Sequence, residues 1–209
     1  MRKLGLIGGM SWVSTRNYYE NINTLMQRRT EPMASAPLLI ESLDFRRLYG
    51  LRTEEDWSRA ADVLGASAQR LEQAGAGALL ICANSMHRVF DKVQQQVGIP
   101  IIHIAEMVGR RMKADGVTNA ALIGTRNVMT ESFYRRQLVA HGVDLLPPEM
   151  TFVEQVDRII YDELMLGKAT REAERTLKTI ITCKEQDGAS AIVLACTELD
   201  MIVDVDANV

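Results

Sequence analysis

An internal repeat restricts the fold of this chain more than any other feature of its sequence. Residues 72–85 (EQAGAGALLICANS) align without a gap on residues 185–198 (EQDGASAIVLACTE), at an offset of 113 residues. A second pair, residues 5–8 (GLIG) and residues 121–124 (ALIG), has an offset of 116 residues. Both pairs could be common helix–strand phrases, but two similar offsets favour a duplicated structural unit. We therefore expect two similar halves in one chain.

Each half has the pattern of alternating strands and helices. Segments 55–73 and 171–186 place apolar residues on one helical face. Between the helical segments lie six short apolar runs that we predict to be buried strands, at residues 4–8, 38–43, 78–82, 101–104, 120–124 and 191–195. Such alternation predicts mostly parallel sheets flanked by helices. The predicted fold class is therefore α/β, with two pseudo-symmetric lobes at residues 1–103 and 104–209.

Composition and charge exclude several classes of protein. The 209 residues are 47% hydrophobic and 24% charged, which is ordinary for a globular chain. Lys plus Arg total 24 against 27 for Asp plus Glu, without a basic stripe, so we expect no nucleic-acid partner. The apolar run at residues 4–10 is too short for a signal peptide or a membrane span. We therefore expect a cytoplasmic protein without a membrane partner.

The cysteines are expected to be free thiols. Cys82, Cys183 and Cys196 form an odd set without CxxC spacing, which argues against a disulfide framework and against a zinc site. Cys183 falls inside a predicted helix, where core packing is the favoured interpretation. Cys82 and Cys196 stand at predicted strand ends, where a thiol is available for chemistry.

Ligands of open parallel sheets bind beyond the carboxyl ends of the strands, so four loops are expected to border one cleft between the lobes. The first loop, residues 8–11 (GGMS), permits tight turns and a close approach of backbone N–H groups to an anion. It lacks the dinucleotide-binding fingerprint, and a small carboxylate suits it better. A plain strand-to-helix turn is the alternative interpretation of this loop.

Two further loops carry amide, hydroxyl and thiol groups at strand ends. They are residues 82–87 (CANSMH) and residues 196–199 (CTEL). A helix starting after each loop would present backbone N–H groups to a carboxylate and would favour the thiolate form of Cys196. The alternative for Cys196 is a buried cysteine with a purely structural role.

Five phrases together carry a family resemblance. They are residues 5–15 (GLIGGMSWVST), 83–87 (ANSMH), 123–126 (IGTR), 162–168 (DELMLGK) and 195–199 (ACTEL). In this order the chain resembles the cofactor-independent aspartate/glutamate racemase family. The resemblance implies two α/β lobes with the active site between them, a homodimer, and a small dicarboxylic amino acid as substrate. It also implies α-proton exchange by two acid/base groups, without a cofactor or a metal.

The resemblance assigns roles to individual residues. It makes Cys196 the thiol acid/base and puts the following residues against the substrate: Met10, Arg52, Asn84, Ser85, Thr125, Lys168, Thr197 and Glu198. Asn84, Ser85 and Thr197 would hold the α-carboxylate. Arg52 and Lys168 are cations that suit a dicarboxylate, with a solvated surface charge as the alternative for each.

The sequence departs from the family at the first acid/base. The repeat sets Cys196 opposite Ala83, and a methyl group cannot carry a proton. Three explanations stay open: another group serves this face, the enzyme needs only one thiol, or the protein is poorly active, which includes an engineered substitution. The candidates for another group are Cys82 after a local bend, Ser85, His87 and a water molecule. For His87 a capping or supporting role is favoured.

A second departure concerns the end of the chain. Val209 follows the ACTEL phrase closely, whereas the family usually continues through another strand and a helix that packs on the first lobe. We predict an aspartate/glutamate racemase that uses Cys196. Two rivals stay open: a single-cysteine decarboxylase or isomerase of the same superfamily, and a dicarboxylate-binding protein with little or no turnover.

Overall fold

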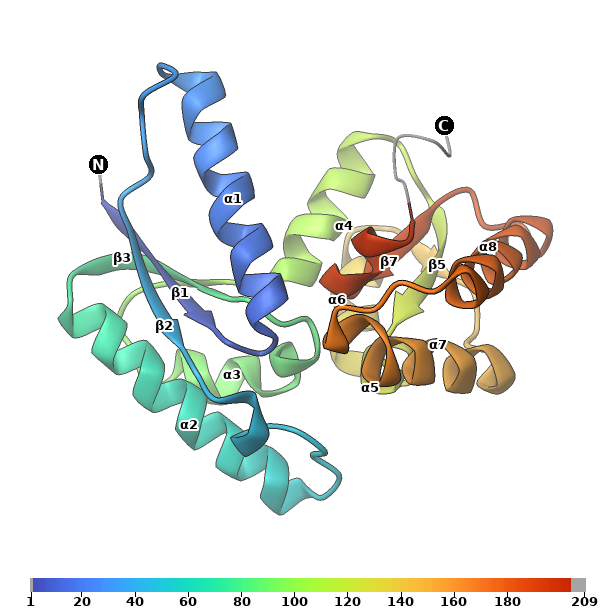
Figure 1. The fold of residues 1–209 in the computed structure, drawn as a ribbon, viewed down its shortest axis with the longest axis horizontal. Helices are drawn as coiled ribbons and strands as arrows, with labels where there is room; N and C mark the ends of the chain where they lie inside the picture. The colour runs from blue at the N-terminus through green and yellow to red at the C-terminus, as the bar shows by residue number, and fades with distance from the viewer. Residues whose placement is uncertain (1, 204–209) are drawn as a thin grey trace. The chain divides into compact units, whose positions relative to one another are not determined.

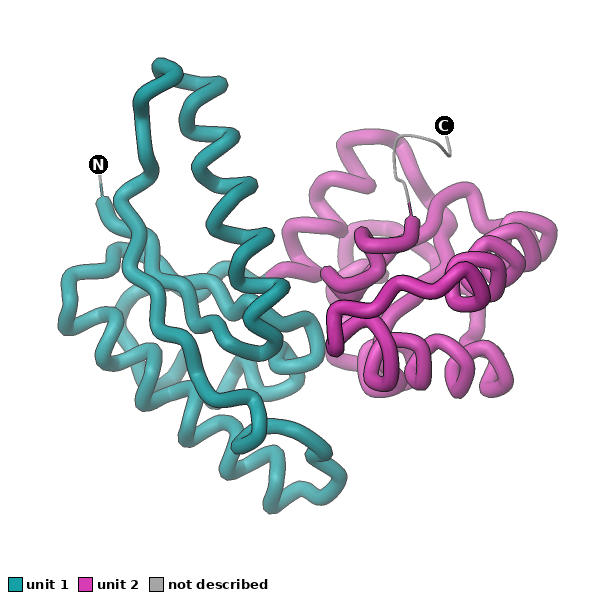
Figure 2. The backbone as a smooth tube through the Cα atoms, viewed as in Figure 1, with its two compact units in different colours: residues 1–103 teal, residues 104–209 magenta. Residues whose placement is uncertain are grey.

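A computed structural model describes residues 2–203 of the chain. The chain separates into two compact units, residues 1–103 and 104–209 (Figure 2). The predicted α/β class is confirmed, because each unit contains a parallel sheet flanked by helices (Figure 1). Residues 204–209, which end the predicted second lobe, lie outside the described residues.

The first unit is built on a four-stranded parallel sheet of order β2-β1-β3-β4. Its strands are β1 (Lys3–Gly8), β2 (Leu38–Ser42), β3 (Ala76–Ile81) and β4 (Ile101–Ile102). Its helices are α1 (Trp12–Arg29), α2 (Glu54–Gln73) and α3 (Phe90–Gln94), with short 3-10 helices at Phe45–Arg47 and Ser85–Val89. Apolar side chains of α2 pack with those of the strands in one core.

Helix α2 shows how the sequence sets an element boundary. Thr53 caps the helix by accepting from the Asp56 N–H, and the Asp56 carboxylate accepts from the Thr53 N–H in return. The apolar stripe that follows, which includes Trp57, Leu64 and Leu71, is buried. The predicted helix 55–73 therefore forms because cap and stripe agree.

The second unit is built on a three-stranded parallel sheet of order β6-β5-β7. Its strands are β5 (Asn119–Gly124), β6 (Asp144–Leu145) and β7 (Ile192–Ala195). Its helices are α4 (Ile104–Ala114), α5 (Arg126–Thr130), α6 (Ser132–Ala140), α7 (Met150–Asp162) and α8 (Arg171–Gln186), with 3-10 helices at Leu164–Leu166 and Thr197–Met201. None of the helices within residues 2–203 combines the length and apolarity needed to cross a membrane.

Strand pairing reproduces the internal repeat. Ile7 pairs with Ile81 between β1 and β3, and Ile123 pairs with Leu194 between β5 and β7. These two pairs correspond under the offsets of 116 and 113 residues read from the sequence. The β1–β3 and β5–β7 strand pairs are therefore equivalent, although β7 ends at Ala195, one residue beyond the equivalent of Ile81, where β3 ends.

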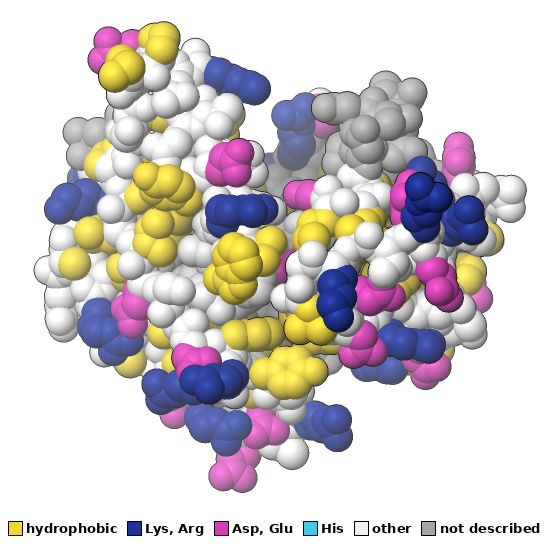
Figure 3. Space-filling model, in the orientation of Figure 1, with side chains coloured by type: hydrophobic (Ala, Val, Ile, Leu, Met, Phe, Trp, Pro, Cys, Tyr) yellow, Lys and Arg dark blue, Asp and Glu magenta, His cyan; other side chains and the backbone are white. Residues whose placement is uncertain are grey.

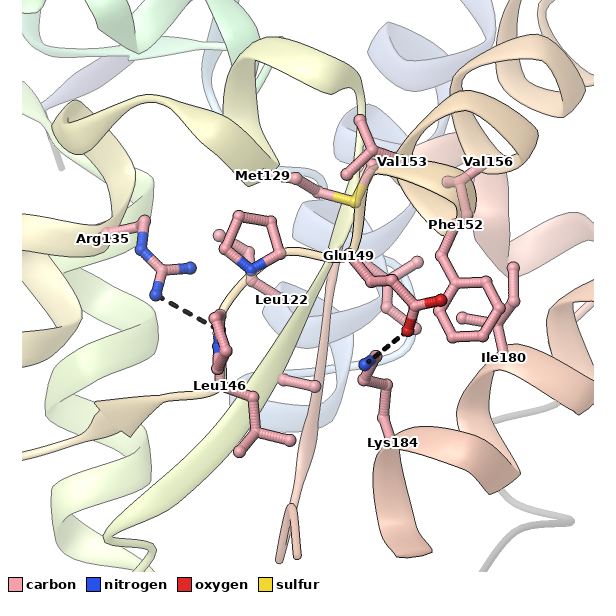
Figure 4. A pocket seen from close by; sticks show the side chains of 14 residues that line it. Leu122, Met129, Arg135, Leu146, Glu149, Phe152, Val153, Val156, Ile180 and Lys184 are labelled. Atoms are coloured by element: carbon pink, nitrogen blue, oxygen red, sulfur yellow. Dashed lines mark hydrogen bonds and ion pairs between the residues drawn. The ribbon is translucent and has the colours of Figure 1, made fainter. Parts of the chain in front are cut away.

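The segment after β6 is held by two cations (Figure 4). Arg135 donates to the carbonyls of Leu145 and Leu146, and Lys184 forms ion pairs with Glu149 and Asp187. A small, mostly apolar cavity of about 30 Å³ lies between these contacts. Its walls belong to the core of the second unit.

Candidate active site

Parallel strands bring the predicted residues of the first unit to one sheet edge. Met10 follows β1, and Ala83, Asn84 and Ser85 follow β3, which lies beside β1. Met10, Ala83 and Asn84 are buried, whereas Ser85 is half-buried. The carboxyl end of this sheet therefore gathers four of the predicted residues.

The glycine turn after β1 is closed by its own hydrogen bonds. Gly9 has a φ of 85°, and a Cβ there would lie 2.1 Å from the Leu43 carbonyl oxygen, so only glycine fits. Its N–H donates to Thr15 Oγ1 over 2.8 Å, and that hydroxyl donates to the Ser11 carbonyl. The Gly9 N–H is thus engaged inside the turn, which favours the plain-turn interpretation for this group over anion binding.

A side chain of α1 holds the strand-end loop, and the sequence analysis missed it. Ser14 is 1% exposed, and its hydroxyl donates to the carbonyl of Cys82 over 2.8 Å. The pattern of Ser11, Ser14 and Thr15 directly after the glycines was the available signal, because small hydroxyl residues at a helix start bond nearby backbone groups. Ser14 therefore fixes the backbone immediately before Ala83.

Two candidates for the missing acid/base at residue 83 are unsuited to it. Cys82 is fully buried, and burial raises the pKa of its thiol to about 12. His87 is 2% exposed, and its Nδ1–H donates to the Ala83 carbonyl over 3.0 Å. Burial, and then the nearby His103, lower the pKa of His87 to about 3, so the ring is neutral at physiological pH. His87 thus supports the loop through its hydrogen bond to the Ala83 carbonyl.

Asn84 presents a buried polar atom without a protein partner. The residue is 8% exposed, and its Oδ1 has no hydrogen-bond partner among the described residues. An unpaired buried amide oxygen costs about 1–3 kcal/mol, so such groups are usually paired or reserved for a ligand. A bound ligand with an N–H donor would satisfy it.

The second unit gathers its candidates in the same way. Gly124 pairs with Ala195, so Thr125 and Cys196 follow neighbouring strands at one sheet edge. A Cβ at Gly124 would lie 2.9 Å from the Ala195 carbonyl oxygen, which explains the glycine. Thr125 is 5% exposed, and its hydroxyl has no partner among the described residues. A donor or acceptor on a ligand could bind there.

Cys196 forms a thiol–carboxylate pair with Glu198. The Sγ–H donates to Glu198 Oε2 over 3.0 Å, and the Thr197 hydroxyl donates to the same oxygen over 3.1 Å. Cys196 and Glu198 are 5% and 3% exposed. Burial, and then the charge of Glu198, raise the pKa of Cys196 well above its ordinary value. Cys196 is therefore a protonated thiol with a proton acceptor in contact.

The expectation of a stabilised thiolate at Cys196 is wrong. The loop leads into the five-residue 3-10 helix Thr197–Met201, and no α-helix among the described residues begins there. The carboxylate of Glu198 and the surrounding apolar side chains disfavour the anion instead. Cys183 also differs from its expected core position, because it is only half-buried on α8.

Arg52 and Lys168 are exposed in their respective units. The Arg52 N–H donates to the Asp56 carboxylate, and the Lys168 N–H donates to the Glu163 carbonyl after the turn at Gly167. Backbone contacts therefore fix both positions, while the two cationic groups face solvent.

Acidic and basic side chains alternate over the face drawn in Figure 3 without a continuous basic stripe. Within the described residues, no cluster of His, Cys, Asp and Glu could hold a metal ion.

Comparison with known proteins places this arrangement in context. The sequence model of the Asp/Glu/hydantoin racemase family matches residues 7–209. The chain is 20% identical over 206 residues to the broad specificity amino-acid racemase RacX of Bacillus subtilis strain 168, covering 96% of this chain and 87% of RacX.

Solved structures agree with the sequence match. A proposed Asp/Glu racemase from Yersinia pestis is 37% identical with a TM-score of 0.89, over 99% of this chain and 90% of that one. An aspartate racemase homologue from Pyrococcus horikoshii OT3 is 31% identical with a TM-score of 0.83, over the same shares. Glutamate racemase from Francisella tularensis shares the fold, with a TM-score of 0.61 at 15% identity over 96% of this chain and 70% of that one.

Proposed function

Because this chain belongs to the Asp/Glu/hydantoin racemase family, we propose that it is an amino-acid racemase in which Cys196 exchanges the α-proton of aspartate or glutamate. The observation that carries the proposal is the buried hydrogen bond from Cys196 to Glu198 at the carboxyl end of β7. A thiol that can lose its proton to an adjacent carboxylate is equipped to act as a base.

The proton balance of the proposed step is simple. The Cys196 proton passes to Glu198, and the thiolate so formed removes the substrate α-proton as the C–H bond breaks. The electron pair moves into the α-carboxylate, which becomes enolate-like. When the same thiol returns the proton to the same face, the original amino acid is restored and Glu198 gives its proton back to sulfur. When a water molecule on the opposite face donates the proton, the enantiomer forms, the sulfur keeps the α-proton, and Glu198 gives its proton to the hydroxide that remains.

Neighbouring polar groups are assigned to the substrate. The buried Thr125 hydroxyl, together with Ser85, would donate to the α-carboxylate and stabilise its developing charge. Thr197, whose hydroxyl donates to Glu198, would contact the α-carboxylate through its backbone N–H. The unpaired Oδ1 of Asn84 would accept from the α-ammonium group. In the proposal, Arg52 and Lys168 bind the side-chain carboxylate of a dicarboxylic substrate, and Met10 lines the site.

We propose that residues 1–103 and 104–209 act as two lobes of one enzyme, without pyridoxal phosphate or a metal, in the cytoplasm and as a homodimer. The family resemblance of the five sequence phrases supports these points.

One observation favours a second candidate function. Ala83 occupies the position that corresponds to Cys196 in the repeat, and neither Cys82 nor His87 is placed to replace it. An enzyme with one thiol can deliver a proton to a single face of a planar intermediate. A decarboxylase or an isomerase that retains configuration would need no more.

Exchange in heavy water tests both candidates. The purified protein is incubated with L-aspartate or L-glutamate in D₂O, while the α-proton signal and the enantiomer ratio are followed by NMR and chiral chromatography. Exchange with formation of the D-amino acid supports the racemase. Exchange with retained configuration supports the single-thiol alternative. Absence of α-exchange with every acidic amino acid would overturn the proposal.

A further inference from the structure

A hollow lined by aromatic side chains opens at the edge of the first unit's sheet. It has a volume of about 490 Å³, which is within the roughly 300–1,000 Å³ typical of small-molecule sites. Its walls come from the turn after β1 and from the segment after β2, and include Gly9, Trp12, Asp44, Phe45, Arg46 and Tyr49. No residue assigned above to proton transfer lines it.

The hollow adjoins the candidate site through the strand order. β1 lies between β2 and β3, and Leu43 at the end of β2 donates to the Gly8 carbonyl over 3.0 Å. Neighbouring strands lie about 4.8 Å apart, so the ends of β2 and β3 are about 10 Å apart. An amino acid bound through Asn84 with its α-carbon above the end of β1 can therefore direct its side chain toward the hollow.

The lining of the hollow suits an uncharged, flat side chain. Phe45 and Tyr49 make an edge-to-face pair with ring centroids 5.8 Å apart. Trp12 and Tyr49 are 63% and 58% exposed, so their rings are accessible to a ligand in the hollow. Three aromatic side chains in one concave surface offer dispersion contacts that a short side chain such as that of aspartate cannot use.

The two charges at this hollow neutralise each other. Arg46 donates three hydrogen bonds to the Asp44 carboxylate, the shortest of 2.6 Å. Hydrogen bonds from Arg46 also lower the pKa of Asp44, so the pair stays ionic at neutral pH. Because Arg46 is paired with Asp44, these two side chains give the hollow no net charge. The hollow therefore discriminates by shape and apolar contact.

We propose that this aromatic hollow binds the side chain of an aromatic amino acid, so that the substrates of the protein extend beyond aspartate and glutamate. The inference rests on the proposed function, because it assumes that the α-carbon is held at the same sheet edge. It assigns Trp12, Phe45 and Tyr49 as specificity-determining residues and phenylalanine as the ligand to test.

Direct binding tests the hollow independently of turnover. Isothermal titration calorimetry with L-phenylalanine is compared for the parent protein and the variants Trp12→Ala and Tyr49→Ala. Each truncation should weaken binding by about ten-fold or more, since an apolar pocket loses this much when a large contact is removed. Tyr19→Ala is the matched control, because Tyr19 is 49% exposed on α1 and does not line the hollow; it should bind like the parent protein.

The outcomes separate the two proposals. Phenylalanine binding that is lost in both hollow variants supports the inference, even if no amino acid exchanges its α-proton, in which case only the racemase proposal fails. If the protein exchanges the α-proton of aspartate but shows no measurable phenylalanine binding, the inference about the hollow is overturned and the racemase proposal stands. Equal phenylalanine affinity in the parent and the hollow variants also overturns the inference. Thermal melting checks that each variant is folded.

Discussion

The thiol of Cys196 lies 3.0 Å from a carboxylate oxygen of Glu198, two residues further along the chain, and donates a hydrogen bond to it. Both side chains are buried, so the negative charge of Glu198 acts on the sulfur through a medium of low polarity. This contact makes Cys196 a neutral thiol at rest and supplies the group that can receive its proton. The chemistry of the site therefore depends on a pair of residues.

Glu198→Gln is predicted to lower the pKa of Cys196. The substitution removes the charge that, after burial, raises this pKa, while the amide can still contact sulfur. The rate of alkylation by iodoacetamide, measured against pH, should therefore reach half of its maximum at a lower pH in the variant. Exchange activity should nevertheless fall by about 100-fold or more, because the proton acceptor is lost. An unchanged alkylation profile would show that the contact with Glu198 does not control the thiol.

Cys196→Ala is predicted to abolish α-proton exchange with aspartate and glutamate. Without sulfur at this position, the proposed step has no group that contacts the α-proton. Cys183→Ser is the control, because Cys183 is half-buried on α8 and away from the strand end; it should keep the parent rate. Residual exchange in Cys196→Ala above the rate without enzyme, with Cys183→Ser unaffected, would assign the chemistry to another residue.

The six predicted strands form as β1, β2, β3, β4, β5 and β7. β1, β3 and β5 are central in their parallel sheets and show continuous apolar runs, whereas β2, β4 and β7 lie at sheet edges within the described residues and were recognised because they also carry apolar residues. β6 was missed, since its two residues, Asp144 and Leu145, form too short an edge strand to show a pattern. β6 is held by Arg135 and by its pairing with β5, and a local sequence pattern does not reveal such tertiary contacts.

The candidate site was predictable in position and less so in chemistry. The repeat and the strand ends predicted where Asn84, Thr125 and Cys196 lie. The raised pKa of Cys196 was not predicted, because it depends on the orientation of Glu198 and on burial. Residue spacing alone cannot distinguish a following α-helix, which would favour the thiolate, from the 3-10 helix that forms.

Ala83→Thr and Ala83→Cys are predicted to increase the rate of racemisation relative to the rate of α-proton exchange. Either substitution supplies a proton-carrying group at the position equivalent to Cys196 in the repeat. Formation of D-aspartate should rise by at least about ten-fold, since a positioned acid/base contributes 10²–10⁴-fold in general. Ala83→Ser, which supplies a hydroxyl without the methyl group of threonine, provides a further comparison. If all three variants form no more D-aspartate than the parent, position 83 is not the missing partner and the single-thiol alternative is favoured.

Thr125→Val is predicted to lower the activity of the protein without lowering its stability. Its hydroxyl is buried without a partner among the described residues, so the isosteric change should leave the free energy of unfolding unchanged or raise it by up to about 1 kcal/mol. Meanwhile kcat/KM for aspartate should fall by about ten-fold, because a donor to the carboxylate is lost. Thr130→Val is the control: its hydroxyl already donates to the Arg126 carbonyl, so it should lose a little stability and no activity. If Thr125→Val lowers the free energy of unfolding as well as kcat/KM, the result would contradict a ligand-binding role for the hydroxyl.

His87 is predicted to make the protein sensitive to acid. Burial and the ring of His103, 4.7 Å away between centroids, lower the pKa of His87 from its ordinary 6.5 to about 3. Because the unfolded chain binds a proton at a higher pH than the folded chain does, this residue costs no stability above pH 6.5. Between pH 6.5 and pH 3, each pH unit should remove up to about 1.4 kcal/mol from the free energy of unfolding. His87→Gln keeps a donor for the Ala83 carbonyl and cannot titrate, so its urea midpoint should fall less steeply over this range. Parallel curves for the parent and His87→Gln would mean that the ring gains its proton without unfolding the loop it supports.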